Sequence, residues 1–347
     1  MSEVYSPERA GRWFLDSGIQ EPSGGVARFY LADSEKNKPV STEITGYAAS
    51  ALALLYCATK DEAYLGAARR AAHFLTDRAW DSAQGIFPFE LGSNLAYFFD
   101  SGIIVRGLLA VWRITKEQEL LEIAVAAAQG MLRDFHSGSD FHPIIEVPGK
   151  TPVDRTDHWS RSAACYQAKS ALAWWEAAQI TGEDRLRDAY LETIEVSLDT
   201  SRDFLPGAHE GPRIMDRLHA ANYFLEALSP LLPREDCVAA YRYVMDRITL
   251  YLRNIAPEFV RSDVYAQLLR ARVYAASAIP VDRDLAREEA AALAEFQRPD
   301  GGFWFGRRAG EIVPHVNPVS TAFAIQALGV WQAFESGSPN PCPYPPI

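Results

Sequence analysis

Residues Ser41-Thr42-Glu43-Ile44-Thr45-Gly46 lead directly into Tyr47-Ala-Ala-Ser-Ala-Leu-Ala-Leu-Leu-Tyr56. A helix that is apolar almost all round, as this second segment is, has to be buried on every side. The same combination of a short polar and aromatic run with an Ala/Leu-rich helix occurs six times in the 347 residues. The steps between copies are 56, 59, 57, 45 and 58 residues, counted from Thr45 to Ser101, Ser160, Arg217, Ser262 and Ser320. Each step has the length of a helical hairpin, so the sequence predicts six repeated hairpins.

Hydrophobic periodicity predicts twelve helices of two alternating kinds. Segments such as residues 163–175 are apolar on all sides, whereas their partners, such as residues 185–198, keep one charged face for water. We therefore expect an all-α fold, an (α/α)6 toroid (barrel) of six inner and six outer helices, over residues 1–335. A Pro-rich tail, residues 336–347, is expected to be extended over the surface or disordered. The predicted helices cover residues 6–18, 44–58, 62–76, 102–115, 118–134, 160–180, 184–199, 215–229, 235–254, 263–278, 282–297 and 319–335.

The connections differ at the two ends of the predicted ring. Turns from inner to outer helices are short and polar, whereas returns to the inner helices span about 25 residues from Asp77 to Ser101 and about 22 from Arg298 to Val319. Long ordered loops inside a compact domain are usually functional. Helix starts also offer free N–H groups and the positive end of the dipole. We expect the working face, and an anionic ligand, where the inner helices begin.

A second motif, Phe296-Gln297-Arg298-Pro299-Asp300-Gly301-Gly302-Phe303-Trp304, precedes the last inner helix. It is similar to the Q-x-x-D-G-G-F/W repeat of the squalene cyclase and protein prenyltransferase group. The alternating helices resemble the (α/α)6 toroid of six-hairpin glycosidases, sugar epimerases and some polysaccharide lyases. The motif predicts a turn in which Gly301 and Gly302 supply positive φ angles. The acidic cluster of the cyclases is replaced here by Asn317-Pro318-Val319-Ser320.

Composition restricts the possible partners. The net charge of −11 disfavours nucleic acid and anionic membranes, because phosphate is bound largely by basic surface. No stretch reaches the roughly 20 apolar residues of a membrane span, and the first residues lack a secretory signal, so we expect a cytoplasmic protein. No metal or other cofactor is expected, and the sequence does not indicate an oligomeric state. The four cysteines show no metal-ligand spacing: Cys57, Cys165, Cys237 and Cys342.

Carboxylates lie at or beside five of the six helix starts. A ring of acids around a concave site suits glycosidic or uronate chemistry, in which one group donates a proton and another accepts one. An Asp before a helix is also a preferred N-cap, which offers a structural explanation for Asp100 and Asp216. The helix dipole is expected to lower the pKa of such acids. The five are Glu43, Asp100, Asp157, Asp216 and Asp263.

Histidines, arginines and tryptophans accompany these acids. Asp157-His158-Trp159 places an acid, a proton carrier and a stacking surface side by side. Planar guanidinium groups match carboxylates. More arginines lie near the helix starts than are needed to pair with the neighbouring acids, which suggests an acidic substrate. The catalytic candidates are Asp157, His158, Asp216, His219, Asp100 and Glu43. The substrate-binding candidates are Arg161, Arg217, Trp159, Trp304, Arg106 and Arg261.

These residues favour an enzyme that acts on a sugar or oligosaccharide, of acidic type, by metal-independent acid–base chemistry. Hydrolysis, epimerisation and β-elimination need the same parts, so the sequence leaves the reaction open. Two alternatives remain. One is an isoprenoid cyclase or prenyltransferase relative, and the other is a toroid that binds glycans without catalysis.

Overall fold

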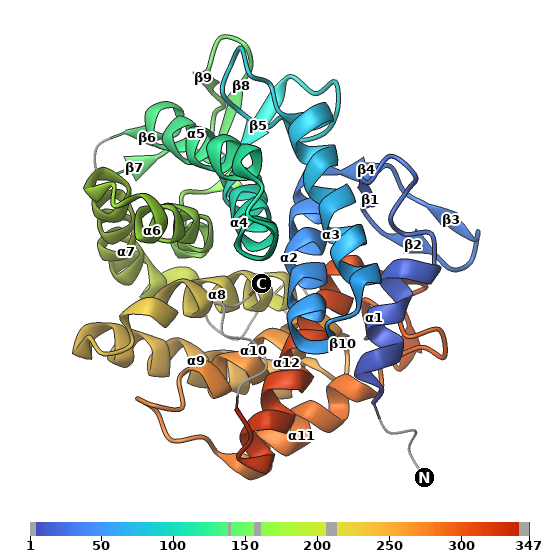
Figure 1. Ribbon diagram of the computed structural model, residues 1–347. Helices are drawn as coiled ribbons and strands as arrows, with labels where there is room; N and C mark the ends of the chain where they lie inside the picture. The colour runs from blue at the N-terminus through green and yellow to red at the C-terminus, as the bar shows by residue number, and fades with distance from the viewer. Residues whose placement is uncertain (1–4, 138–139, 156–160, 206–213, 340–346) are drawn as a thin grey trace.

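The computed structural model describes residues 5–137, 140–155, 161–205, 214–339 and 347, and within them twelve α-helices form two concentric rings (Figure 1). This confirms the predicted all-α toroid of six inner and six outer helices. The inner helices are α2 (Thr42–Thr59), α4 (Phe98–Thr115), α6 (Ala168–Thr181), α8 (Ile214–Leu228), α10 (Ser262–Tyr274) and α12 (Pro318–Ser336). The outer helices are α1 (Pro7–Asp16), α3 (Glu62–Phe74), α5 (Gln118–Asp134), α7 (Asp184–Phe204), α9 (Glu235–Ile255) and α11 (Arg283–Ala294).

Each inner helix packs against the next one along the chain, and α12 packs against α2 to close the ring. Glycines permit the closest approaches between them. A methyl group added at Gly107 of α4 would lie 2.5 Å from the carbonyl oxygen of Gly46 in α2. One added at Gly102 would lie 2.6 Å from the Cα atom of Ser170 in α6. The Ala- and Gly-rich composition of the inner segments therefore serves close helix packing.

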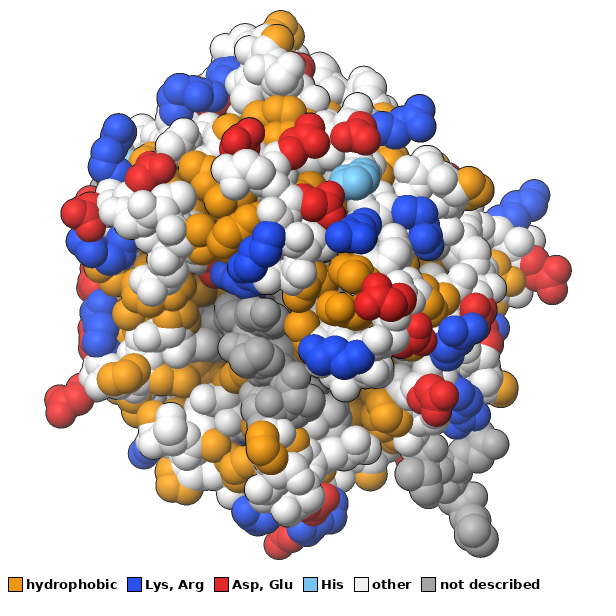
Figure 2. Space-filling view, viewed as in Figure 1, with side chains coloured by type: hydrophobic (Ala, Val, Ile, Leu, Met, Phe, Trp, Pro, Cys, Tyr) orange, Lys and Arg blue, Asp and Glu red, His pale blue; other side chains and the backbone are white. Residues whose placement is uncertain are grey.

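The short turns at one end of the barrel follow from how three inner helices stop. Lys60, Lys116 and Gly182 cap α2, α4 and α6 in the left-handed conformation, which ends the helix abruptly. The outer helix then begins within two residues, with Asp61 as the N-cap of α3. Figure 2 shows this face, where acidic and basic side chains are both spread over the surface, as expected of amphipathic outer helices.

The motif around residues 297–302, between α11 and α12, is held against α1 and so joins the last hairpin to the first helix. The Gln297 amide accepts from the backbone N–H of Ser6 at 3.0 Å and donates to its carbonyl oxygen at 2.9 Å. Gly301 has a φ of +101°, and a Cβ atom there would lie 2.0 Å from the carbonyl oxygen of Arg9. The prediction that Gly302 also needs a positive φ is wrong. Gly302 is required instead by its close approach to Trp13, because a Cβ atom at residue 302 would lie 2.7 Å from the indole nitrogen of Trp13.

Short strands in the long connections join neighbouring hairpins at the end where the inner helices begin. One sheet, β5–β8–β9, links the loops before α4 and α6, and another, β13–β2–β3, links the first and last connections. A third, β10–β11–β12, links the loops before α10 and α12, and β1–β4 and β6–β7 are two-stranded. The strands are β1 (Val26–Ala27), β2 (Tyr30–Leu31), β3 (Lys36–Asn37), β4 (Val40–Ser41), β5 (Leu95–Tyr97), β6 (His136–Ser137), β7 (Asp140–Phe141), β8 (Ile144–Glu146), β9 (Thr151–Pro152), β10 (Phe259–Arg261), β11 (Gly306–Arg308), β12 (Glu311–Ile312) and β13 (His315–Val316).

Two features differ from the sequence prediction. Helix α6 begins at Ala168, after a 3₁₀ turn at Cys165–Gln167, rather than at residue 160. Ile347, at the end of the predicted surface tail, is instead buried inside the barrel and is only 5% exposed. None of the helices in the described ranges has the length and apolar character needed to cross a membrane.

Candidate active site

Two carboxyl groups lie on neighbouring inner helices where those helices begin. Glu43 is in the first turn of α2 and Asp100 is the third residue of α4. Asp100 is 6% exposed, and its Oδ2 atom is buried without a hydrogen-bond partner among the described residues. An unpaired buried carboxylate is costly, because the charge loses its hydration. The site therefore favours the protonated form of Asp100.

Electrostatics at this pair reverses the expected direction of the pKa shift. Burial, and then the charge of Glu43, raise the pKa of Asp100 well above its usual range. Burial raises the pKa of Glu43 to about 7, although the positive charge of Arg28 opposes this shift. The predicted lowering by the helix dipole is wrong here because desolvation is the larger effect. The N-cap explanation is also wrong, because Tyr97 is the N-cap of α4 and Asp216 is the third residue of α8.

Arg28 brings a positive charge to the same side of the barrel. It follows strand β1 in the connection between α1 and α2. Its Nη2 atom lies 3.2 Å from Glu90, and its guanidinium group lies 5.0 Å from the ring centre of Phe89. The side chain remains 38% exposed, so one part of the guanidinium group is accessible to a ligand. Its charge lowers the pKa of both Glu43 and Asp100 against the effect of burial.

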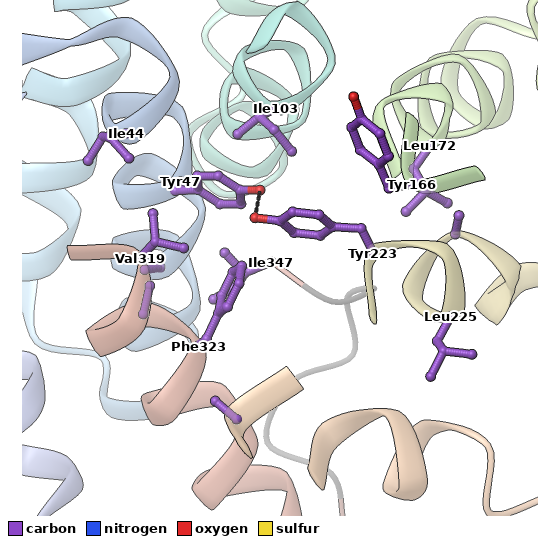
Figure 3. Packing of buried hydrophobic residues seen from close by; sticks show 14 of the residues in the cluster. Ile44, Tyr47, Ile103, Tyr166, Leu172, Tyr223, Leu225, Val319, Phe323 and Ile347 are labelled. Atoms are coloured by element: carbon purple, nitrogen blue, oxygen red, sulfur yellow. Dashed lines mark hydrogen bonds between the residues drawn. The ribbon is translucent and has the colours of Figure 1, made fainter. Parts of the chain in front are cut away.

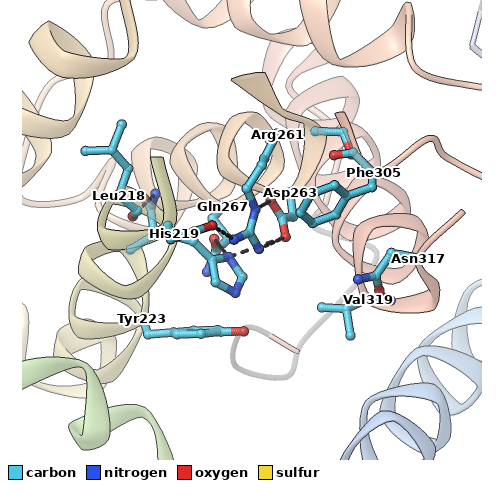
Figure 4. Close-up of polar contacts among 12 residues, drawn as sticks. Leu218, His219, Tyr223, Arg261, Asp263, Gln267, Phe305, Asn317 and Val319 are labelled. Atoms are coloured by element: carbon cyan, nitrogen blue, oxygen red, sulfur yellow. Dashed lines mark hydrogen bonds and ion pairs between the residues drawn. The ribbon is translucent and has the colours of Figure 1, made fainter. Parts of the chain in front are cut away.

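His219 forms the second group of the site, on α8 (Figure 4). Its Nδ1 atom is 2.7 Å from Gln267 Oε1 and 3.5 Å from Asp263 Oδ2. Burial, and then the charge of Arg261, lower the pKa of His219 to about 4, although Asp263 acts in the opposite direction. The imidazole is therefore neutral at physiological pH, which suits a proton acceptor.

Arg261 holds the acids around His219 in place. Its Nε and Nη2 atoms bind both oxygens of Asp263 at 3.0 and 2.6 Å, and its Nη1 atom binds Asp216 at 2.7 Å. The guanidinium group also lies 4.7 Å from the ring centre of Phe305. Burial raises the pKa of Asp263, but the ion pair with Arg261 outweighs it and the net shift is downward. Arg261 is thus committed to two carboxylates of the protein.

Tyr223 connects the carboxyl pair to the histidine. Its ring centre lies 4.5 Å from that of His219 and 4.9 Å from that of Phe99, the residue next to Asp100. Its hydroxyl group is 3.1 Å from that of Tyr47, so α2 and α8 meet at the centre of the barrel (Figure 3). The charge of Glu43 raises the pKa of Tyr223 further, after burial. Both groups of the site therefore border the same central region.

A fully buried charge cluster lies deeper in the barrel. Glu226 forms ion pairs with Lys169 and Arg270, and Gln267 Nε2 lies 3.3 Å from its Oε1 atom. Ile347 lies against this cluster, because its carbonyl oxygen accepts from Lys169 Nζ at 2.6 Å. All three charged side chains have no exposed surface. We call Lys169, Glu226, Arg270 and Gln267 the barrel-floor cluster.

The remaining candidates are more dispersed. Arg106 is buried between α4 and α6, where its Nε atom binds Glu176 at 2.7 Å. Arg217 Nη1 donates to the carbonyl oxygen of Phe204 at 3.5 Å, and Arg161 is exposed. Trp304 is partly buried under Arg298, whose guanidinium group lies 4.3 Å from its ring. Three further candidates lie outside the described residues: Asp157, His158 and Trp159.

Three residues of the candidate site were not predicted from the sequence. Arg28 precedes the first repeat, and nothing in its local pattern indicated its position. Tyr223 and Gln267 lie one and a half turns or less beyond the polar helix starts, on apolar segments that read as core. The signal that was available is the helical spacing, because Tyr223 follows His219 by four residues and therefore shares its face. Within the described ranges, no three His, Cys, Asp or Glu side chains converge as a metal ion would need.

Comparison with known proteins shows the fold class. No protein-family model matches the chain, and no curated protein matches its sequence. Among solved structures, cellobiose 2-epimerase from Spirochaeta thermophila DSM 6192 superposes with a TM-score of 0.74 at 15% identity, covering 95% of this chain and 97% of that chain. A D-mannose isomerase gives 0.72 at 12% identity over 94% and 96%. Unsaturated glucuronyl hydrolase from Bacillus sp. GL1 gives 0.69 at 14% identity over 96% and 97%. The chain thus has the (α/α)6 toroid fold of these sugar-active enzymes.

Proposed function

We propose that the protein is a carbohydrate-active enzyme that transfers protons at a sugar bound where the inner helices begin. The observation that carries this proposal is the Asp100 carboxyl group, buried next to Glu43 with one oxygen lacking a partner among the described residues. A carboxylic acid kept protonated near neutral pH is suited to protonate a glycosidic or enolic oxygen. Sugar-active structural neighbours support the same class of substrate.

The two sides of the site have complementary roles in this proposal. Asp100 is the general acid, and burial, followed by the charge of Glu43, keeps it protonated. His219, neutral above about pH 4, is the general base on the opposite side of Tyr223. Each positioned proton-transfer group typically contributes 10²- to 10⁴-fold to the rate. The pKa of Asp100 is raised and that of His219 is lowered, so at neutral pH the proposed acid carries its proton and the proposed base is free to accept one.

The proposed substrate is acidic, but fewer arginines are available to bind it than the sequence suggested. Arg261 and Arg106 are committed to carboxylates of the protein. Arg28 is partly exposed and Arg161 is exposed, and the charges of both act on Tyr97, where they oppose the raising of its pKa by burial. A uronate carboxylate placed near Tyr97 would meet both guanidinium groups.

The reaction type is resolved by one experiment. The protein is incubated in D₂O with cellobiose, mannose, a saturated uronate oligosaccharide and an unsaturated glucuronyl disaccharide, and the sugars are followed by NMR. Hydrolysis of a glycosidic bond gives cleavage without deuterium on a sugar carbon, whereas hydration of the unsaturated ring gives cleavage with deuterium on the carbon that accepts the proton. Epimerisation or isomerisation gives deuterium at the carbon next to the carbonyl, and elimination from the saturated uronate gives a new double bond.

The matched variants are D100N, H219Q and D199N, the last altering an exposed aspartate of α7. We expect turnover of at least one sugar by the wild type and D199N, with losses of about 10²-fold or more in D100N and H219Q. Full activity of D100N would contradict the proposal.

A further inference from the structure

Gln267, a member of the barrel-floor cluster, lies between the proposed base His219 and Glu226. Its Oε1 atom is 2.7 Å from His219 Nδ1, and its Nε2 atom is 3.3 Å from Glu226 Oε1. The side chain is fully buried. A buried primary amide with an imidazole on one side and a carboxylate on the other has only one orientation that satisfies both neighbours.

Glu226 decides that orientation. Burial raises its pKa, but the ion pairs with Arg270 and Lys169 outweigh burial, and the net pKa is lowered. Glu226 is therefore an anion, which accepts hydrogen bonds and donates none. Only the NH₂ group of Gln267 can face it, so the amide oxygen must face His219. That oxygen in turn can bond only to a protonated ring nitrogen.

We infer that Gln267 is a positioning residue that holds His219 as the Nδ1–H tautomer and leaves Nε2 unprotonated. Asp263 Oδ2, 3.5 Å from the same Nδ1 atom, is a second acceptor on that side and supports the same tautomer. Nε2 lies on the opposite side of the ring from Gln267 and Asp263 (Figure 4). The His219 side chain keeps 10% of its surface exposed, and no described residue bonds to Nε2.

The chain of contacts explains why charged side chains are retained in a fully buried position. Lys169 and Arg270 hold Glu226 ionised, Glu226 orients Gln267, and Gln267 sets the proton position on His219. A neutral core would pack as well and avoid the desolvation cost. The tautomer itself is independent of the substrate. Only the use of Nε2 as a base rests on the proposed function.

The test is ¹⁵N NMR of histidine-labelled protein at about pH 7, where neutral tautomers give distinct nitrogen shifts. The His219 signal is identified by its loss in H219Q. We expect Nδ1–H for the wild type, in which Gln267 offers an acceptor oxygen, and also for D199N, which leaves this site unchanged. In Q267M, which has similar volume but no such acceptor, we expect the Nε2–H form to become populated.

Two results overturn the inference: an Nε2–H tautomer in the wild type, or an unchanged Nδ1–H tautomer in a folded Q267M variant. The melting temperature of each variant confirms folding, and the wild-type tautomer alone remains decisive if Q267M does not fold. Activity separates this inference from the proposed function. In Q267M, a shifted tautomer together with a loss in kcat of about 10²-fold and an unchanged KM supports both the positioning role of Gln267 and the proposed role of His219 as the base. A shifted tautomer with full kcat upholds the positioning by Gln267 and removes His219 as the base.

Discussion

The hydroxyl groups of Tyr47 and Tyr223 meet 3.1 Å apart at the centre of the barrel. This contact joins α2, which carries Glu43, to α8, which carries His219. The proposed base therefore borders the same region as Glu43, the neighbour of the proposed acid Asp100, although α2 and α8 come from hairpins that are not adjacent in the ring.

Replacing Asp100 with Asn is expected to raise stability at alkaline pH. The folded-state pKa of Asp100 is raised, so its stabilising contribution is complete at acidic pH and is lost as the pH rises through the folded pKa. An amide carries no charge at any pH and avoids this loss. Each unit of pKa difference corresponds to about 1.4 kcal/mol, so D100N is expected to gain at least this amount at about pH 9. Urea denaturation at about pH 5 and 9 measures it, with D199N as the control. An equal effect of D100N at both pH values would contradict the assignment.

Replacing His219 with Gln is expected to abolish the acidic limb of the pH–rate profile. Because burial, and then Arg261, lower the pKa of His219 to about 4, the wild-type rate falls only as the pH approaches that value. H219Q lacks the titrating base and loses about 10²-fold or more in kcat. Exposed His73 on α3 supplies the control variant, H73Q. A wild-type acidic limb near the ordinary histidine pKa would contradict the buried, neutral imidazole.

The lowered pKa of His219 also makes the free energy of unfolding depend on pH. His219 in the folded protein binds its proton less readily than in the unfolded chain, so the unfolded state takes up more protons on acidification. Stability should therefore fall between about pH 6.5 and 4, by up to about 3 kcal/mol for this group. H219Q should show a smaller fall over this range, measured by urea denaturation. An identical pH dependence in the two proteins would contradict the prediction.

Replacing Glu226 with Gln is expected to be severely destabilising. The substitution removes the carboxylate that both Lys169 and Arg270 contact, at a position with no exposed surface. Breaking a buried ion pair in this way typically costs about 3–5 kcal/mol. Thermal and urea denaturation measure the loss against E119Q, which alters an exposed glutamate of α5. A change below about 1 kcal/mol would mean that the cluster is not held together by this charge.

Replacing Gly301 with Ala tests how the ring closes. The added Cβ atom would lie 2.0 Å from the carbonyl oxygen of Arg9, in addition to the strain of a φ of +101°. Gly92 provides the matched control, because its φ is +82° and no atom lies within 4 Å of its hypothetical Cβ. We expect G92A to lose about 1 kcal/mol from strain alone and G301A to lose clearly more. Equal losses would show that contact with α1 does not limit residue 301.

The architecture was predictable because its signals are local and repeated. Fully apolar segments such as residues 47–56 alternate with amphipathic ones, and the left-handed caps at Lys60 and Lys116 lie in the polar turns that the sequence indicated. The start of α6 was misplaced because the residues before Ala168 keep helical periodicity, but residues 165–167 fold as a 3₁₀ turn and residues 162–164 are not helical. Periodicity does not separate these two states over so few residues.

The candidate site was predictable in its location but less so in its electrostatics. Glu43, Asp100, Asp216 and His219 were identified from the polar runs at helix starts; the first three lie in the first turn of their helices, and His219 is the sixth residue of α8. The upward direction of the Asp100 pKa shift was not predicted, because burial of this carboxyl group by other hairpins is a tertiary property. The pairing of Arg106 with Glu176 was missed for the same reason, since the two residues are 70 positions apart.

The protonation state of Asp100 tests the central claim most directly. Infrared difference spectra of wild type minus D100N, recorded from about pH 5 to 9, detect the carbonyl stretch of a protonated carboxyl group without any substrate. The account predicts this band at about pH 7, with loss of the band at higher pH. A spectrum that contains only the ionised carboxylate at about pH 7 would contradict the account, because Asp100 would then have no proton to donate.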